Sequence, residues 1–339
     1  MKRKVKSTVA LLLLFALGLS VQAEGAREGA DGEEAPEKIL ITFADHNAIG
    51  SILNKNALLF KETLEEETNG RVEVRYFPAS QMGNERENIE AVQLGTTEMC
   101  YADPPYLSNL VPEFSVLGLP YIFRDFEHVE AAMDGEVGDA LEEKLLEEEG
   151  LKILGWYHVG FRDMMTVDTP VREMADFEGM KFRSPEVPVF VKMFRAIGAT
   201  PTPIPWGDVY TAMRTNLVDG METTPEAMVS VKLYEVAEYV IHTNHMNTAM
   251  TIIVNEDFYN DLPQDIKDAI DRTILTTQEW QRREMIEASN NAFGLLEDEG
   301  MEIIDIDTAP MQEAVKPVWG ELTADAPDAQ RLIDMVLQL

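Results

Sequence analysis

Only one cysteine, Cys100, occurs among the 339 residues. No disulfide can therefore form within the chain, and the fold must depend on packing, for which a chain of this length has enough core. Cys100 lies in an apolar run, where a free cysteine is more often a buried residue than a nucleophile. We expect Cys100 to be buried and inert.

The sequence also lacks the short motifs of the common enzyme classes: GxGxxG, GxxxxGKS/T, GxSxG and HExxH are all missing. Of the five histidines only His242 and His245 lie close together, and no cysteine or acidic ligand pattern accompanies them. We expect a protein that is not an enzyme and that needs neither a cofactor nor a metal ion.

Positive charge is scarce, with 28 Lys and Arg against 61 Asp and Glu and a net charge of −33. Loss of residues 1–23 would remove four positive charges, so that 24 − 61 leaves −37. This balance argues against nucleic acids and anionic membrane surfaces as partners. An acidic protein can still bind an anion where a buried cation receives it, and such a cation should stand out locally.

The N-terminus has the pattern of a secretory signal peptide. Four basic residues between positions 2 and 6 precede an apolar run, Val9 to Val21, which is shorter than the roughly 20 residues that a membrane crossing needs. Val21-Gln22-Ala23 supplies small residues for cleavage, and no cysteine follows that could carry a lipid anchor. We predict a signal peptide at residues 1–23, cleaved after Ala23, and a periplasmic protein.

Residues 24–37 are rich in Gly, Ala and Glu and lack apolar periodicity, which predicts a flexible acidic tether. Beyond it, strands and helices alternate, as in parallel sheets flanked by helices. We expect strands at 39–43, 71–77, 99–101, 153–159, 162–167, 180–183, 218–221 and 249–254. We expect helices at 51–69, 84–94, 187–197 and 208–215.

A longer helix is predicted from Gln264 to about Leu296, because apolar residues recur there at helical spacing. A helix of roughly 30 residues spans about 45 Å, which is longer than one small domain needs. We expect it to cross two lobes.

Several segments carry a family resemblance. Residues 180–228 read MKFRSPEVPVFVKMFRAIGATPTPIPWGDVYTAMRTNLVDGMETTPEAM, and TNGRVEVRYFPASQMGNERENIEAVQLGT, LGLPYIF and TNH occupy 68–96, 117–123 and 243–245. In their joint spacing these segments resemble the periplasmic solute-binding subunits of tripartite ATP-independent (TRAP) transporters, DctP type. The resemblance covers nearly all of the chain after the signal peptide.

The resemblance implies an α/β, two-lobed periplasmic binding-protein fold in which hinge strands and a long helix join the lobes, which close on a ligand. We place lobe I at residues 38–160 plus 249–288 and lobe II at 161–248 plus 289–339. It also implies membrane permease subunits as partners, and we expect the chain to be a monomer.

The resemblance further implies an arginine that binds the substrate carboxylate, which is Arg183 in KFRSP. A planar guanidinium can hold a carboxylate through two parallel hydrogen bonds. Arg162 matches a second cationic position, and Trp206 stands where the family often has an aromatic residue over the ligand. Thr223 stands where many members have Asn, so a hydrogen-bonding group is kept but the two donors of the amide are lost.

Other residues match pocket-facing positions of the family, and the acidic ones among them could accept hydrogen bonds from ligand hydroxyls. They are His46, Asn47, Glu85, Asp103, Tyr106 and Glu186.

Together these residues favour a small organic acid as the ligand, and a sugar acid such as a uronate or aldonate would use both the arginine and the acceptors. A C4-dicarboxylate would need more cations than these candidate residues supply. An ectoine-like zwitterion would use Arg183 and Trp206. Two other functions stay open from the sequence: a periplasmic sensor that presents its ligand to a signalling receptor, and a hydrolase built on a binding-protein scaffold.

Overall fold

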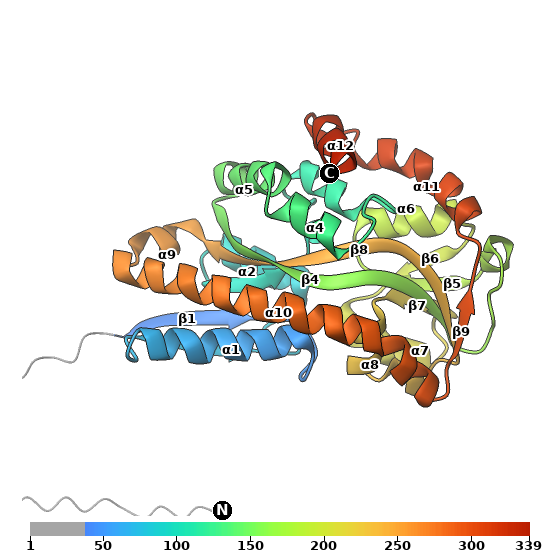
Figure 1. Cartoon of the computed structure of the whole chain (residues 1–339), viewed down its shortest axis with the longest axis horizontal. Helices are drawn as coiled ribbons and strands as arrows, with labels where there is room; N and C mark the ends of the chain where they lie inside the picture. Colours follow the sequence, from blue (N-terminus) through green and yellow to red (C-terminus); the bar gives the residue numbers. More distant parts are fainter. Residues whose placement is uncertain (1–37) are drawn as a thin grey trace, which may run out of the picture. The chain divides into compact units, whose positions relative to one another are not determined.

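A computed structural model describes residues 38–339 (Figure 1). The predicted signal peptide and tether lie outside the described residues. The strands are β1 (Ile39–Ala44), β2 (Val72–Phe77), β3 (Met99–Ala102), β4 (Leu151–Thr166), β5 (Lys181–Ser184), β6 (Thr200–Pro203), β7 (Gly220–Thr223), β8 (Tyr239–Asn255) and β9 (Glu302–Asp305). They form one sheet in the order β2-β1-β3-β8-β4-β7-β5-β6, with β9 paired to β8.

Helices cover this sheet and connect its strands. They are α1 (Ile52–Glu67), α2 (Glu85–Gln93), α3 (Pro104–Leu107), α4 (Phe126–Met133), α5 (Glu136–Glu149), α6 (Pro188–Ala196), α7 (Val209–Arg214), α8 (Pro225–Ser230), α9 (Glu256–Asp261), α10 (Gln264–Asp298), α11 (Ala309–Leu322) and α12 (Ala329–Gln338). All five predicted helices are present, with ends within two residues of prediction. None of the helices within residues 38–339 combines the length and the hydrophobicity that crossing a membrane requires.

The sheet consists of two parallel parts joined by two long strands. The first half-sheet (β2, β1 and β3) is parallel, and so is the second half-sheet (β7, β5 and β6). β8 and β4 pair antiparallel between them, β3 pairs antiparallel with β8, and β7 with β4. The two half-sheets therefore run in opposite directions.

The register places the carboxyl ends of the two half-sheets opposite each other. The last residue of β3 pairs with Thr251, which pairs in turn with Trp156 of β4. The last residue of β7, Thr223, pairs with Asp163, which also belongs to β4. Residues 157–162 of β4 therefore lie between the two sets of carboxyl ends, which is where α/β proteins usually bind their ligands.

Two of the predicted strands proved to be one. The sequence suggested a break between 153–159 and 162–167, but β4 runs unbroken from Leu151 to Thr166. Its pairing with β8 shifts register at three places, one of them at Gly160, where φ is +114°. Such bulges insert a residue and bend a strand without ending its pairing. β8 likewise begins at Tyr239, ten residues before the predicted start, because polar residues obscure the pattern there.

β6 was not predicted at all, because its sequence, TPTP, contains two prolines. It lies at the edge of the sheet, where the missing N–H groups of proline leave no neighbouring strand unpaired.

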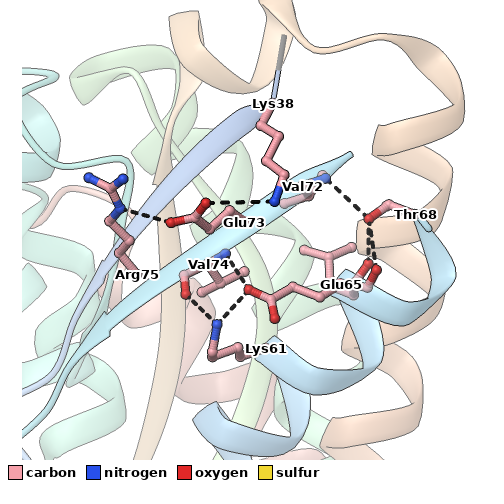
Figure 2. Close-up of polar contacts among 9 residues, drawn as sticks. Lys38, Lys61, Glu65, Thr68, Val72, Glu73, Val74 and Arg75 are labelled. Atoms are coloured by element: carbon pink, nitrogen blue, oxygen red, sulfur yellow. Dashed lines mark hydrogen bonds and ion pairs between the residues drawn. The ribbon is translucent and has the colours of Figure 1, made fainter. Parts of the chain in front are cut away.

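The edge strand β2 is held by side chains of α1 (Figure 2). The Lys61 ammonium donates to the carbonyl of Val74 at 2.8 Å, and a carboxylate oxygen of Glu65 accepts from the Val74 amide at 2.8 Å. Thr68, just after the helix, accepts from the Val72 amide at 3.3 Å. These bonds satisfy outward-facing backbone groups that an edge strand leaves without a partner.

The helix predicted to be exceptionally long is α10, with 35 residues (Figure 1). At 1.5 Å per residue it spans about 52 Å. It packs against α1, β4 and α8, and thus against elements of both halves. Its side chain Gln281 is fully buried and bonds both backbone groups of His158, accepting from its amide at 3.0 Å and donating to its carbonyl at 2.6 Å.

Candidate functional site

A cavity lies where the carboxyl ends of the half-sheets face each other. Nine of the ten residues singled out from the sequence are among the thirteen that line it. The thirteen are His46, Asn47, Glu85, Asp103, Tyr106, Val159, Arg162, Arg183, Pro185, Trp206, Thr223, Ala227 and Met250. Residues far apart in the chain therefore share one cavity, although their contact with a ligand stays a prediction.

Each half of the sheet supplies one wall. From the first half-sheet, His46 and Asn47 follow β1 and Asp103 follows β3. From the second, Arg183 lies in β5 and Thr223 ends β7. Arg162 and Met250 come from β4 and β8, which connect the halves. Any movement of one half relative to the other would therefore change the shape of this cavity.

The positive charge of Arg162 is already balanced. Its guanidinium donates two hydrogen bonds to the carboxylate of Glu222, one of them 2.8 Å from Nη2 to Oε1, and Nη1 lies 3.4 Å from the hydroxyl of Thr248. Glu222 is fully buried. Burial alone would raise the pKa of Glu222, but Arg162 and His245 lower it to about 2. Arg162 and Glu222 thus form a buried, neutral pair.

Arg183 is the other buried cation of the cavity, with 2% of its surface exposed. Its Nε donates to the carbonyl of Ile204 at 2.9 Å, and its guanidinium carbon lies 5.8 Å from the ring centroid of Trp206. Across the chain from Lys38 onward, no carboxylate forms an ion pair with Arg183. Burial lowers the pKa of Arg183 to about 10, so it stays charged at neutral pH. It is a desolvated cation without a direct counter-ion.

Glu85, Asp103 and His46 line the side of the cavity that the first half-sheet supplies, and we call this side the acidic wall. Burial favours the neutral form of each of these groups. Burial and then the charge of Asp103 raise the pKa of Glu85 well above its usual range. Burial also raises the pKa of Asp103 to about 7, although Arg162 lowers it, and burial lowers the pKa of His46 to about 4. Burial therefore reduces the negative charge of this wall, and the cavity combines the cation Arg183 with several hydrogen-bonding groups.

Close contacts fix this wall in place. The backbone amide of Asp103 donates to Oε1 of Glu85 at 2.6 Å, and Nε2 of His46 lies 3.5 Å from Oε2 of Glu85. The amide and the side-chain nitrogen of Asn47 both donate to Asp45, each at 2.7 Å. Burial raises the pKa of Asp45 to about 6. Asp45 therefore orients Asn47 although it does not line the cavity.

Glu186 is the one sequence-predicted site residue that does not line the cavity. Its backbone carbonyl accepts a 3.3 Å hydrogen bond from the exposed Arg86 of α2. At the turn after β5, Glu186 thus contacts the first half through its backbone carbonyl rather than through its carboxylate.

Sequence reasoning missed several residues of the site. Val159, Pro185, Ala227 and Met250 line the cavity, but apolar residues are too common for a sequence to single them out. Glu222 could have been noticed, because it is the acidic residue of the VDG-E pattern at 218–222. Among residues 38–339 no group of three or more His, Cys, Asp and Glu side chains is placed to hold a metal ion.

Comparison with known proteins places the chain among binding proteins. Residues 43–325 match the model of the DctP family, described as bacterial extracellular solute-binding protein, family 7. The C4-dicarboxylate-binding periplasmic protein DctP of Rhodobacter capsulatus is 32% identical over 84% of this chain and 87% of its own length.

Two solved structures are similar in fold. A TRAP periplasmic solute-binding protein from Xanthobacter autotrophicus with bound β-D-galacturonate aligns with a TM-score of 0.84 and 27% identity, covering 88% of this chain and 99% of its own. The sugar acid binding protein DctPAm from Advenella mimigardefordensis in complex with galactonate aligns with a TM-score of 0.85 and 25% identity, covering 90% and 99%.

Proposed function

The chain belongs to family 7 of the bacterial extracellular solute-binding proteins, the DctP family, and we propose that it captures a sugar acid in the periplasm for a TRAP-type transporter. The ligand is a uronate or an aldonate, held by its carboxylate at Arg183. The loaded protein then delivers it to the membrane permease subunits.

The observation that carries the proposal is the environment of Arg183. A buried cation without a counter-ion is costly in free energy, and a ligand carboxylate would remove that cost. The planar guanidinium suits a carboxylate, and charge-assisted bonds of this kind are roughly twice as strong as neutral ones. Arg162 offers less, because Glu222 already accepts from its Nε and Nη2 and balances its charge.

The rest of the cavity favours a hydroxylated acid with a single carboxylate. Asp103, Glu85 and Asn47 present oxygen and nitrogen atoms opposite the cation, which suit sugar hydroxyls. Trp206 offers an aromatic face, which suits the apolar side of a sugar ring. A second carboxylate would have to lie near the acidic wall without a cation of its own. The similar proteins with galacturonate and galactonate bound support this choice.

The direct test is to denature the purified protein, identify the released small molecule by mass spectrometry, and measure its affinity by calorimetry. We expect a uronate or an aldonate. The proposal would be overturned if the protein bound neutral sugars or peptides and showed no measurable binding of D-galacturonate, D-galactonate and related acids.

A further inference from the structure

A chain of hydrogen bonds lies behind Asn47, which lines the ligand cavity just after the end of β1. It runs from Asn47 to Asp45, from Asp45 to Tyr76 of β2, and from Tyr76 to Asn54 of α1. Asp45 and Asn54 are buried, with 1% and 4% of their surface exposed. None of the three residues behind Asn47 lines the cavity, so they can affect a ligand only through Asn47.

A backbone amide fixes the direction of this chain at its end on α1. The amide of Gly50 donates to Oδ1 of Asn54 at 2.9 Å. Because a backbone amide can only donate, the carboxamide of Asn54 must turn its Nδ2 to the other side, where it donates to the hydroxyl of Tyr76 at 2.9 Å. Burial and the charge of Asp45 raise the pKa of Tyr76, so the hydroxyl keeps its proton. The Tyr76 hydroxyl donates that proton to Oδ2 of Asp45.

A second backbone amide fixes the end of the chain that reaches the cavity. The amide of Asn47 donates to Oδ1 of Asp45 at 2.7 Å, so this oxygen is an acceptor whether or not the carboxyl group is protonated. The side chain of Asn47 lies 2.7 Å from the same oxygen. The atom at that position must be Nδ2, because two acceptors would repel each other. The carbonyl of Asn47 accepts from the amide of Ala79 at 3.0 Å, so the backbone is held as well.

We propose that Asp45 is a positioning residue that sets the specificity of the cavity. It makes Asn47 present its carbonyl oxygen to the ligand, so that the ligand group opposite Asn47 must be a hydrogen-bond donor. Within residues 38–339 no group donates to Oδ1 of Asn47, which leaves this oxygen for a ligand. This inference deepens the proposed function and rests on it for the ligand, but the hydrogen bonds that hold Asn47 exist without one.

The constraint separates acids that are similar in size and charge. A uronate or an aldonate carries hydroxyls along its length and can place one of them opposite Asn47, where it donates to Oδ1. A carboxylate or keto oxygen at the same position would be a second acceptor and would leave Oδ1 without a donor. An unmade hydrogen bond of this kind costs more affinity than a good one adds. The preference for a hydroxyl therefore comes from Asp45, which lies outside the cavity.

The test measures, by calorimetry, the affinity for D-galacturonate and for analogues in which fluorine replaces one hydroxyl at a time. Fluorine cannot donate, so at the hydroxyl opposite Asn47 it should weaken binding to the wild type roughly tenfold. In Asn47→Ala the same replacement should cost no more than about twofold, because the acceptor is gone. Asp45→Ala should reduce the cost to about twofold as well, because Asn47 is then free to turn.

Asp45→Asn separates positioning from charge. This variant removes the negative charge but keeps an oxygen that can accept from Asn47, so most of the cost of fluorine should remain. Asp125→Ala is the matched control, because Asp125 also accepts from a backbone amide, that of His128 at 2.8 Å, and lies outside the cavity. It should show the full cost.

Three results would overturn the proposal. The first is a cost that persists undiminished in Asp45→Ala or, should that variant not fold, in Tyr76→Phe, which removes the hydroxyl bonded to Asp45. The second is equal behaviour of Asp45→Asn and Asp45→Ala, which would attribute the effect to charge. The third is a wild type that tolerates fluorine at every hydroxyl.

A second readout needs no ligand. In nuclear magnetic resonance spectra of the ligand-free protein, the side-chain amide signals of Asn47, identified by their loss in Asn47→Ala, should exchange slowly with solvent. They should exchange faster in Asp45→Ala and remain unchanged in Asp125→Ala. Equal exchange in Asp45→Ala and wild type would overturn the positioning role. Failure of the wild type to bind D-galacturonate or D-galactonate would instead overturn the proposed function, and the exchange rates would still decide whether Asp45 holds Asn47.

Discussion

Arg183 and Arg162 differ in what surrounds them rather than in their burial. Arg162 is paired with the carboxylate of Glu222, whereas Arg183 forms no ion pair within residues 38–339 and instead donates to the carbonyl of Ile204 beside the ring of Trp206. Removing one partner of a buried charge pair leaves the other uncompensated, so the two arginines should respond differently to mutation. Arg162 is expected to matter for stability and Arg183 for binding.

Arg183→Ala should therefore weaken binding of the cognate acid by about 3–5 kcal/mol, or roughly two to four decades in Kd. The free energy of unfolding without ligand should fall little or even rise, because an uncompensated buried cation is removed. Arg183→Lys should also bind poorly, since a point charge cannot form the two parallel bonds. Calorimetry and chemical denaturation measure both quantities. Arg195→Ala, at an exposed position of α6, is the control; wild-type affinity in both Arg183 variants would refute the assignment.

Asp103 should make binding depend on pH. Its pKa is about 7 without ligand, and a bound anion near Arg183 would raise it further. Protons are then taken up on binding, so affinity should fall as pH rises through 7, by at most about tenfold per pH unit. Calorimetry between pH 6 and 8 would show the slope. Asp103→Asn should remove most of this dependence of affinity on pH. An affinity that rises with pH would contradict the prediction.

At the scale of the elements, the contact between α10 and β4 stands out. The Gln281 side chain satisfies both backbone groups of His158 at one of the bulges of β4. Gly155 shows how tightly the helix lies on the strand, because a Cβ there would lie 2.8 Å from Ile274 and 2.6 Å from Gln278. The bulged centre of the strand therefore depends on the helix for its hydrogen bonds.

Gln281→Ala should accordingly lower the free energy of unfolding by about 2–4 kcal/mol, because two buried backbone groups would lose their partners. Denaturant titration measures this loss. Arg283→Ala, exposed on the same helix, should change stability by no more than about 0.5 kcal/mol. If the two variants were equally stable, the bridge to His158 would have no energetic role.

At the scale of the molecule, the cavity has walls from both half-sheets, which β4, β8 and α10 connect. The α/β periplasmic binding-protein fold expected from the sequence is confirmed by the similar solved structures. The lobe boundaries at 160, 248 and 288 stay a prediction, as does closure. Closure requires that the ligand bind the closed form more tightly than the open form.

We expect the radius of gyration from small-angle X-ray scattering to fall when the cognate acid saturates the protein, because hinge closure brings the halves together. Arg183→Ala at the same ligand concentration should keep the larger radius. Identical curves for the wild type with and without ligand would indicate a rigid scaffold. They would also weaken the case for delivery to a permease, which is expected to distinguish loaded from empty protein by shape.

The sequence by itself determined the features that depend on neighbouring residues. Apolar spacing was enough for α10 and the helices at 52–67 and 85–93, since helical periodicity is local. It also predicted that Cys100 would be buried, and the structure places it fully inside β3. The family resemblance singled out Arg183, because KFRSP is a contiguous motif.

The tertiary structure decided what depends on residues distant in the chain. Only folding shows that Arg162 is neutralised by Glu222, sixty positions away, and that Arg183 is not neutralised in this way. Only the tertiary structure makes β4 continuous through Gly160, because β8 pairs with it on both sides of the bulge and Gln281 of α10 bonds the backbone of His158 at the bulge itself. Charge compensation and strand pairing act across space, and no local pattern in the sequence records them.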